Sequence, residues 1–251
     1  NPSAARFGLR CHRWPVPSGM RIATWNTKWA GPTHGPTIAG DLVATKADVI
    51  VGTEVLVDLL PSYEHVVDAG TGWGYELPDG RRRKVAMWSA NPWTDVTTFD
   101  DPAAPGGRLI AATTETDVGP IRVVGVCIPW RDANVATGRR DRESWEDHLA
   151  FLSALPSMMM EQPLPVVVVG DFNQRIPQGS QPRRVFDALS EALAGLGVPT
   201  AGETDHGQLI DHVAHSPELS SSVTDIICPS RDGVTLSDHH GVVVDLQQRA
   251  R

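Results

Sequence analysis

Polar side chains suited to a metal or acid–base site stand at the ends of several apolar segments of this sequence. The segments offer amides, carboxylates or imidazoles, with almost no lysine or arginine among them. Oxygen ligands of this kind suit a hard divalent cation, and a histidine beside them can donate or accept a proton. The residues are Asn26, Glu54, Asp171, Asn173, Asp211, Asp238 and His239.

Two interpretations of these residues are open from their types alone. Glu54 with Asp238 or Asn26 could supply the one or two carboxylates that Mg²⁺ takes besides water and phosphate oxygens. Asp and Asn also cap helices and shape turns, and Asp171 could do only that after the apolar run VVVV. Their joint occurrence at several strand ends, together with an Asp-His doublet, favours a catalytic site.

The elements that must position these side chains follow from the apolar pattern. Runs rich in valine and isoleucine predict strands over 20–25, 48–53, 84–89, 108–116, 121–128, 165–170, 208–214, 223–228 and 241–246. Apolar residues at three- and four-residue steps predict helices over 38–45, 142–155 and 183–196, with Pro156 ending the second. Turn signals at 78–80 and 117–120 predict hairpins, so the pattern indicates a layered α/β architecture rather than a purely parallel sheet.

Composition limits the class of protein. The chain has 251 residues, of which 41% are hydrophobic and 21% charged, as in globular proteins. No apolar run approaches the ~18 residues that cross a bilayer, so we expect no membrane span. The net charge of −8 excludes an overall basic field for nucleic acid and leaves only a local patch. Three cysteines without metal-ligand spacing predict a reducing, cytoplasmic location, and we expect a monomer.

The first residues differ from the rest of the chain. Residues 1–19 have no apolar run long enough for a signal peptide, and we treat them as an N-terminal extension of uncertain status. Met20 could be the natural start. No repeat, low-complexity block or long linker follows it, which predicts a single domain over 20–251.

The motifs of this sequence resemble those of a known superfamily. They are, in order, RIATWN, DVIVGTE, KVAMWS, IRVVGVCIP, VVVVGDFN, LIDHV and LSDHHGVVVDL. They resemble the endonuclease/exonuclease/phosphatase superfamily, which includes DNase I-like nucleases, AP endonucleases, sphingomyelinases and inositol-polyphosphate 5-phosphatases. GDFN and SDH together are specific, whereas WN or TE alone is weak. The resemblance implies a four-layer α/β/β/α sandwich, in which two mixed β-sheets are flanked by helices.

The resemblance also implies a divalent metal, Mg²⁺ or Mn²⁺. Asn26 and Glu54 match the positions that lie at the metal in such proteins, and Asp238 is placed near it. Lys28 departs from the pattern, because some AP endonuclease-like members have a carboxylate there. A lysine would reduce the number of metal ligands or bind substrate phosphate itself.

The catalytic residues implied by the resemblance are Asp171, Asn173, Asp211 and His239. Asp171 and Asn173 would position and activate water and hold the phosphoryl group. His239 would stabilise charge on a non-bridging phosphate oxygen, and Asp211 would orient His239 and raise its pKa. Cys127 departs from many nucleases, which carry Tyr or His there, and we interpret it as a small buried hydrophobe.

An arginine-rich segment, 129–148, follows the strand that ends near Ile128. Arginine offers a bidentate fork to phosphate, so Arg131 and Asn134 are candidate substrate contacts, and Trp130 could stack on a base. Acidic residues alternate with the arginines, and a solvated, self-paired loop explains the pattern equally well. A second basic run, 81–84, contains no acidic residue and is a candidate clamp or a solubilising turn.

These observations predict a Mg²⁺- or Mn²⁺-dependent hydrolase of phosphoester bonds. The first interpretation is an endonuclease- or exonuclease-type phosphodiesterase, with a phosphorylated substrate and DNA among the candidates. The alternative is a phosphatase or phosphodiesterase acting on a lipid or small phosphorylated molecule, which the net charge of −8 favours. A catalytically inactive phosphate-binding module is the second alternative, from which losses among the site residues would be expected.

Overall fold

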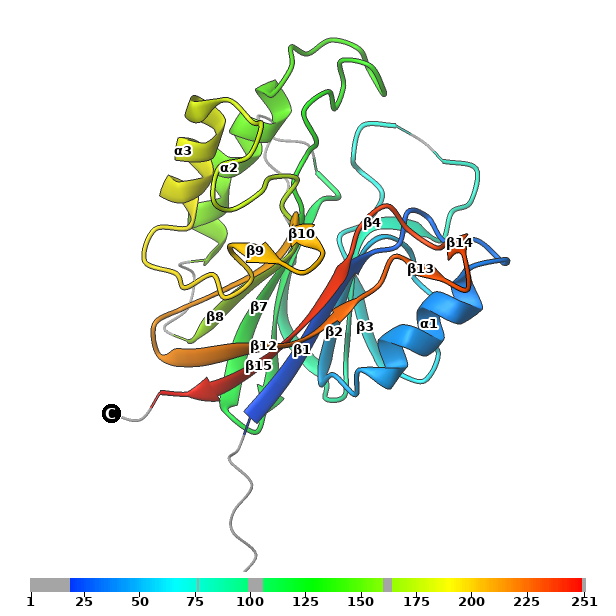
Figure 1. Cartoon of the computed structure of the whole chain (residues 1–251), viewed down its shortest axis with the longest axis vertical. Coiled ribbons are helices and arrows are strands. Elements are labelled where there is room, and N and C mark those ends of the chain that lie inside the picture. The colour runs from blue at the N-terminus through cyan, green and yellow to red at the C-terminus, as the bar shows by residue number, and fades with distance from the viewer. Residues whose placement is uncertain (1–18, 76, 99–105, 160–163, 250–251) are drawn as a thin grey trace, which may run out of the picture.

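A computed structural model describes residues 19–75, 77–98, 106–159 and 164–249 of the chain (Figure 1). Almost all of the predicted extension therefore lies outside the described residues. Two β-sheets form the centre of the molecule, and helices cover their outer faces (Figure 1). No helix of the described part is both long and apolar enough to cross a membrane.

The first sheet has six strands, in the order β12-β15-β1-β2-β4-β3. Their bounds are Gly19–Asn26 for β1, Val49–Leu56 for β2, His65–Asp68 for β3, Arg82–Ser89 for β4, Leu219–Ile227 for β12 and Gly241–Gln248 for β15. β1 is parallel to β2 and antiparallel to β15, so the sheet is mixed. Two short hairpins, β9 (Glu203–Thr204) with β10 (Gly207–Gln208) and β13 (Ser230–Arg231) with β14 (Val234–Thr235), lie outside both large sheets.

The second sheet has five strands, in the order β11-β8-β7-β6-β5. Their bounds are Trp93–Thr98 for β5, Leu109–Thr116 for β6, Gly119–Cys127 for β7, Val166–Asp171 for β8 and Asp211–His215 for β11. β7 and β8 are parallel, and the other pairs are antiparallel. Both sheets are thus mixed, as predicted.

Three apolar cores separate four layers. Side chains such as Val51, Val123 and Val169 fill the space between the two sheets. Helices α2 (Glu146–Met159) and α3 (Arg183–Ala192) pack on the outer face of the five-stranded sheet, and α1 (Gly35–Ala44) packs on that of the six-stranded sheet. Strands buried on both faces need apolar residues at every position, which explains the run at 166–169. The predicted α/β/β/α sandwich is confirmed.

The structure corrects the helix limits. The second helix starts at Glu146 rather than at 142, because Trp145 has a φ of 74°, outside the helical range. Pro156 lies inside this helix instead of ending it. α3 begins at Arg183 as predicted but ends at Ala192, four residues before the predicted 196.

Several strands at the edges of the sheets were not predicted, or were predicted with other limits. β3 and β5 are the outer strands of their sheets, and half or more of the residues of β5 are exposed. Strands with one wet face carry polar residues and lack a continuous apolar run, so the pattern of buried strands does not find them. β12 starts at Leu219 rather than at 223, with a register shift between Val223 and Asp225.

Candidate active site

The topology brings the predicted site residues to one edge of the sandwich. β1 and β2 are parallel, and Asn26, the last residue of β1, pairs with Thr53 of β2, so that Asn26 lies beside Thr53-Glu54 at one end of the first sheet. Asp171 ends β8 in the second sheet, and its cross-strand partner is Asp211, the first residue of β11. Sequence segments up to 185 residues apart, from Asn26 to Asp211, thus reach the same edge.

A hydrogen-bond network joins the two sheets around Asp171. Its Oδ2 accepts a bond from Asn26 Nδ2 at 3.0 Å and another from Asn173 Nδ2 at 2.9 Å. Its Oδ1 accepts a bond from the backbone N–H of Asn173 at 2.8 Å. Asn173 has a φ of 51°, a backbone conformation that asparagine tolerates better than most residues. The network fixes the Asp171 carboxylate, which is 2% exposed.

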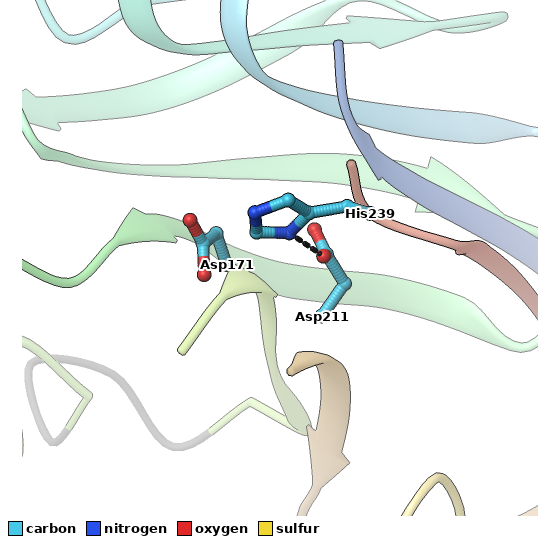
Figure 2. Close-up of side chains that lie close together, drawn as sticks. All are labelled: Asp171, Asp211 and His239. Carbon is cyan, nitrogen blue, oxygen red and sulfur yellow. Dashed lines mark hydrogen bonds and ion pairs between the residues drawn. The ribbon is translucent and has the colours of Figure 1, made fainter. Parts of the chain in front are cut away.

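His239 lies between two carboxylates, as Figure 2 shows. Its Nδ1 is bonded to Asp211 Oδ2 at 2.5 Å. Ligand atoms of His239, Asp211 and Asp171 lie within 4.8 Å of one another. The backbone carbonyl of His239 accepts a bond from Trp25 Nε1 at 2.8 Å, so a buried tryptophan of β1 holds the histidine backbone in place.

Burial and charge shift two pKa values in the centre of this site. Burial by itself would lower the pKa of His239, but the charge and hydrogen bond of Asp211, together with Asp171, outweigh it and raise the pKa to about 10. Burial raises the pKa of Asp171 to about 7, although the nearby His239 opposes the shift. A cationic imidazole therefore stands beside a carboxylate that exchanges its proton near neutral pH.

Glu54 lies at the same edge and is bound by a lysine that the sequence did not single out for the site. Lys84 Nζ of β4 contacts Glu54 Oε1 at 2.6 Å, and the Lys84 side chain is 4% exposed. Glu54 has a φ of 46°, which is uncommon for a residue with a Cβ and is often found at functional sites. A lysine next to the apolar run 85–88 is a signal that could have revealed this residue.

A buried arginine, Arg108, stands behind Lys84. It is 2% exposed, and its Nη1 donates to the Cys127 carbonyl at 3.4 Å. Its Nε has no hydrogen-bond partner among the described residues, and no carboxylate pairs with it there. A buried guanidinium without an anion is costly, which makes Arg108 a second residue of the site that the sequence analysis missed. The signal was an arginine directly before a buried strand.

Cys127 is the cross-strand neighbour of Asp171, on the parallel strand β7. It is 1% exposed, and burial raises the pKa of its thiol to about 12. The interpretation of Cys127 as a small buried side chain agrees with this position, because such a thiol is neutral and unreactive.

Asp238 and Lys28 form an ion pair at the rim of the site. Lys28 Nζ lies 3.2 Å from Asp238 Oδ2, and both side chains are more than half exposed. The backbone N–H of Lys28 also donates to Asn26 Oδ1 at 2.9 Å. Asp238 therefore faces solvent beside the site, whereas Asn26 is locked into it.

The donor set fits a hard divalent cation. Glu54, Asp171 and Asn26 offer oxygen atoms, and Asp171 and Asp211 are buried carboxylates whose negative charge is only partly balanced by His239. Mg²⁺ and Mn²⁺ prefer such oxygen ligands together with water and phosphate oxygens. Asp211 is bonded to His239 Nδ1, Glu54 to Lys84 and Asn26 Oδ1 to the Lys28 N–H, so a cation would share these oxygen ligands with the bonds already present.

The predicted substrate residues of the loop after β7 differ in exposure. Arg131 is exposed and lines a pocket that also contains Asn173, so the structure brings it to the site. Trp130 is 41% exposed at the start of the loop. Asn134 is 2% exposed, and its Nδ2 donates to Asp147 at 2.6 Å. Asn134 thus holds the loop together from within and does not face the pocket.

The basic run 81–84 is largely neutralised, because three of its four cations pair with acids, while the Arg82 guanidinium lies over the Trp29 ring. Arg81 is bonded to Asp58 and Asp79, and Arg83 to Asp68. Lys84 pairs with Glu54, as described above. Asp79 stands two residues before the run, but Asp58, Asp68 and Glu54 come from other turns and strands, which a local sequence window cannot show. The run does not form a free basic clamp.

The remaining histidines stay outside the site. His212 is fully buried, and its ring nitrogens contact Thr200 Oγ1 at 2.9 Å and the Gln174 carbonyl at 3.1 Å. His215 contacts Ser221 Oγ at 2.7 Å. His212 points away from Asp211, its neighbour in the strand, as the alternation of a β-strand requires.

Three solved structures have a similar fold. An endonuclease/exonuclease/phosphatase from Beutenbergia cavernae DSM 12333 has a TM-score of 0.64 and 21% identity, over 92% of this chain and 72% of the other. Sphingomyelinase C from Streptomyces griseocarneus has a TM-score of 0.63 and 15% identity, over 90% and 99%. The endonuclease domain of TRAS1, a telomere-specific non-LTR retrotransposon, has a TM-score of 0.59 and 16% identity, over 92% and 100%.

The sequence comparisons complete the assignment. No curated protein matches the chain at a significant level. The model of the endonuclease/exonuclease/phosphatase family matches residues 23–239, a range that contains Asn26, Glu54, Asp171, Asp211 and His239. With the sandwich fold and these side chains at one edge of it, this match shows that the chain belongs to the endonuclease/exonuclease/phosphatase family.

Proposed function

We propose that this protein is a metal-dependent hydrolase of phosphoester bonds that cleaves phosphodiesters. One observation carries the proposal: the His239 imidazole stands between Asp211 and Asp171 at the edge where Glu54 also lies. Hydrolysis of a phosphoester needs an oriented water and fixed positive groups aimed at the developing charge. This arrangement offers both within one small volume.

His239 supplies the positive donor. Asp211 holds Nδ1, so the other ring nitrogen, Nε2, is left to donate to a non-bridging phosphate oxygen. The raised pKa keeps the imidazole cationic at neutral pH. The Trp25 bond to the His239 carbonyl limits movement of the ring, which favours a donor that needs little reorganisation during the reaction.

Asp171 is the proposed base for the attacking water. Its carboxylate is oriented by Asn26 and Asn173, and a pKa of about 7 matches the range in which general bases are effective. We assign the amide oxygen of Asn173, Oδ1, the role of orienting water or a phosphoryl group. Asn173 Nδ2 is also bonded to the Ile128 carbonyl at 2.9 Å, which fixes that orientation.

Glu54 and Asn26 are the residues that would hold the metal, with Asp238 beside them. A bound divalent cation supplies charge stabilisation to the phosphoryl oxygens and the leaving group. Lys84 orients the Glu54 carboxylate, and Arg108 adds a second buried positive charge behind it. Substitution of Lys84 or of Arg108 by a neutral residue is expected to weaken binding of a phosphate anion at this edge.

A second candidate function is hydrolysis of a small phosphorylated molecule. The neutralised run 81–84 and the net charge of −8 favour it, because non-specific binding of a duplex depends on a basic face. The similar structures include both an endonuclease domain and a sphingomyelinase, so the fold accommodates substrates of either size.

The test is hydrolysis of bis-p-nitrophenyl phosphate and p-nitrophenyl phosphate with Mg²⁺, Mn²⁺ or EDTA. We expect EDTA-sensitive turnover of the diester above the monoester, and a loss of about 10²-fold or more in His239→Ala. His65→Ala, on the outer strand β3, is the control and should retain activity. Turnover that is equal in His239→Ala and the control would contradict the proposal. Faster hydrolysis of the monoester would favour a phosphatase.

A further inference from the structure

A pocket of about 530 Å³ opens beside Asn173. Three arginines line it, from three different parts of the chain: Arg131 from the loop after β7, Arg175 from the loop after β8, and Arg184 from α3. None of the described residues that line it is acidic. Because Asn173 belongs to both the pocket and the candidate active site, the pocket is a continuation of that site.

The arginines of this pocket are poorly neutralised. Arg131 lies 3.4 Å from Asp132, and Arg175 and Arg184 have no carboxylate partner in the described part of the chain. The adjacent Arg183 differs, since its Nε is bonded to Asp187 at 2.7 Å and it does not line the pocket. The whole protein has a net charge of −8, whereas the described residues that line this cavity include three arginines and no acid. The cavity is therefore a positively charged region of an acidic protein.

The first turn of α3 adds to the positive character. The helix begins at Arg183 after Pro182, with no side-chain cap and no acidic residue in its first turn. The N-terminal end of a helix carries a partial positive charge and free N–H groups, where natural sequences usually place Asp or Glu. Two arginines at this position are unfavourable unless an anion binds nearby.

Gln174 indicates that a ligand has a polar group besides its negative charge. The residue is 2% exposed and lines the pocket, and its Nε2 contacts His148 Nε2 at 2.7 Å and the Val185 carbonyl at 3.1 Å. Its Oε1 has no hydrogen-bond partner among the described residues. A buried acceptor of this kind is satisfied by a hydroxyl donor.

From these contacts we infer that the pocket is a subsite for a second phosphate group of the substrate, next to the phosphoester that is hydrolysed. Arg131, Arg175 and Arg184 bind this second phosphate through charge-assisted hydrogen bonds, with Gln174 accepting from a neighbouring hydroxyl. The inference rests on the proposed function. A nucleic acid strand and a small bisphosphorylated molecule both present this chemistry.

Two matched substrates test the subsite. They are the p-nitrophenyl ester of thymidine 5′-phosphate and the same ester with an added 3′-phosphate. We expect the wild type to have a KM about tenfold lower for the ester with the second phosphate, in line with one charge-assisted contact. Arg184→Ala should bring the ratio of the two KM values close to one. Arg183→Ala, the neighbour that is paired with Asp187, should keep the tenfold ratio.

A binding measurement separates failure of the subsite from failure of the proposed function. Titration calorimetry compares thymidine 3′,5′-bisphosphate with thymidine 5′-phosphate, without turnover. If the wild type binds the bisphosphate more tightly and Arg184→Ala abolishes this difference, the result supports the subsite. If neither ester is hydrolysed in addition, the subsite stands and the proposed function is wrong. Equal binding of the two nucleotides by the wild type, or an equal loss in Arg183→Ala, overturns the subsite.

Single-stranded oligothymidylate then assigns the source of the second phosphate. If the KM for cleavage of this oligonucleotide rises in Arg184→Ala and not in Arg183→Ala, the subsite contacts the next phosphate of a strand. Hydrolysis of the bisphosphate ester without cleavage of the oligonucleotide supports the same subsite with a small bisphosphorylated molecule as its ligand.

Discussion

The imidazole of His239 and the carboxylate of Asp211 join the two sheets through one hydrogen bond of 2.5 Å. Asp211 begins β11 of the five-stranded sheet, whereas His239 precedes β15 of the six-stranded sheet. The orientation of the imidazole therefore depends on how the two sheets pack. Any change in that packing alters the direction in which Nε2 points.

Asp211→Asn tests this relationship. The amide keeps the shape of the carboxylate but removes the negative charge that does most to raise the pKa of His239, so the imidazole is less protonated and its Nδ1 bond loses charge assistance. We expect kcat for bis-p-nitrophenyl phosphate to fall by about 10²-fold or more, with a smaller change in KM. Asp187→Asn, on the exposed face of α3, is the matched control. An Asp211→Asn protein with wild-type kcat would show that the pair has no catalytic role.

Glu54→Gln tests the proposed metal ligand. A neutral amide is a weaker ligand for a hard cation than a carboxylate, so the variant should need a higher Mg²⁺ or Mn²⁺ concentration for half-maximal activity. Direct titration with Mn²⁺, followed by electron paramagnetic resonance, should show weaker binding in the absence of substrate. The exposed Glu64→Gln is the control. Unchanged Mn²⁺ affinity in Glu54→Gln would remove Glu54 from the metal site.

Thiol labelling tests the burial of Cys127. In a Cys11→Ser background, the exposed Cys228 should react with a thiol reagent at once, whereas Cys127 should react only after denaturation. Cys127 is buried beside Asp171, and its raised pKa leaves almost no thiolate at neutral pH. The measurement is the number of thiols labelled per chain before and after unfolding. Rapid labelling of both cysteines in the native protein would contradict this environment.

Two buried histidines each contribute stability that is lost at mildly acidic pH. Burial lowers the pKa of His148 and of His212 to about 4, below the ordinary 6.5, so the unfolded chain binds more protons than the folded chain between these values. The contribution of these histidines to the free energy of unfolding therefore rises with pH in this window and is lost as the pH falls from about 6.5 towards 4. Asp171, with its pKa raised to about 7, contributes with the opposite sign, so the histidine contribution is read from the difference between a variant and the wild type. Each histidine contributes about 1 kcal/mol per pH unit.

Urea unfolding at pH 7, 6 and 5 measures this dependence. His212→Gln should have a smaller slope of stability against pH than the wild type, even where its stability at pH 7 is lower. The exposed His206→Gln should keep the full slope. A slope that His212→Gln leaves unchanged would show that this histidine is protonated in the folded protein.

Much of the fold follows from local patterns in the sequence. The run 166–169 requires a strand covered on both faces, and the structure buries all of these valines between β7 and β11. The edge strand β5 was not predictable in the same way, because its exposed residues carry no apolar alternation. The start of α2 depended on the backbone of Trp145, whose N–H is bonded to the Arg131 carbonyl in the same loop.

The candidate site shows the same division. The residue types and their order marked Glu54, Asp171 and His239 as candidates, because carboxylates and imidazoles next to apolar strands are visible in a linear sequence. The resemblance also predicted Asp211 as the partner of His239, but two cations were not visible: Lys84, the partner of Glu54, and the buried Arg108 behind it. The pocket beside Asn173 likewise gathers Arg131, Arg175 and Arg184 from separate loops and a helix.

Sequence by itself determined the kind of chemistry and the layered α/β class, since both depend on residue types and on short-range apolar periodicity. Only the tertiary structure decided which charges neutralise one another and which remain free. It paired Arg81, Arg83 and Lys84 with acids, mostly from other segments, and left Arg175 and Arg184 of the pocket without a carboxylate partner among the described residues. Electrostatic interactions act through space over a few ångströms, so they depend on the packing of the two sheets and not on distance along the chain.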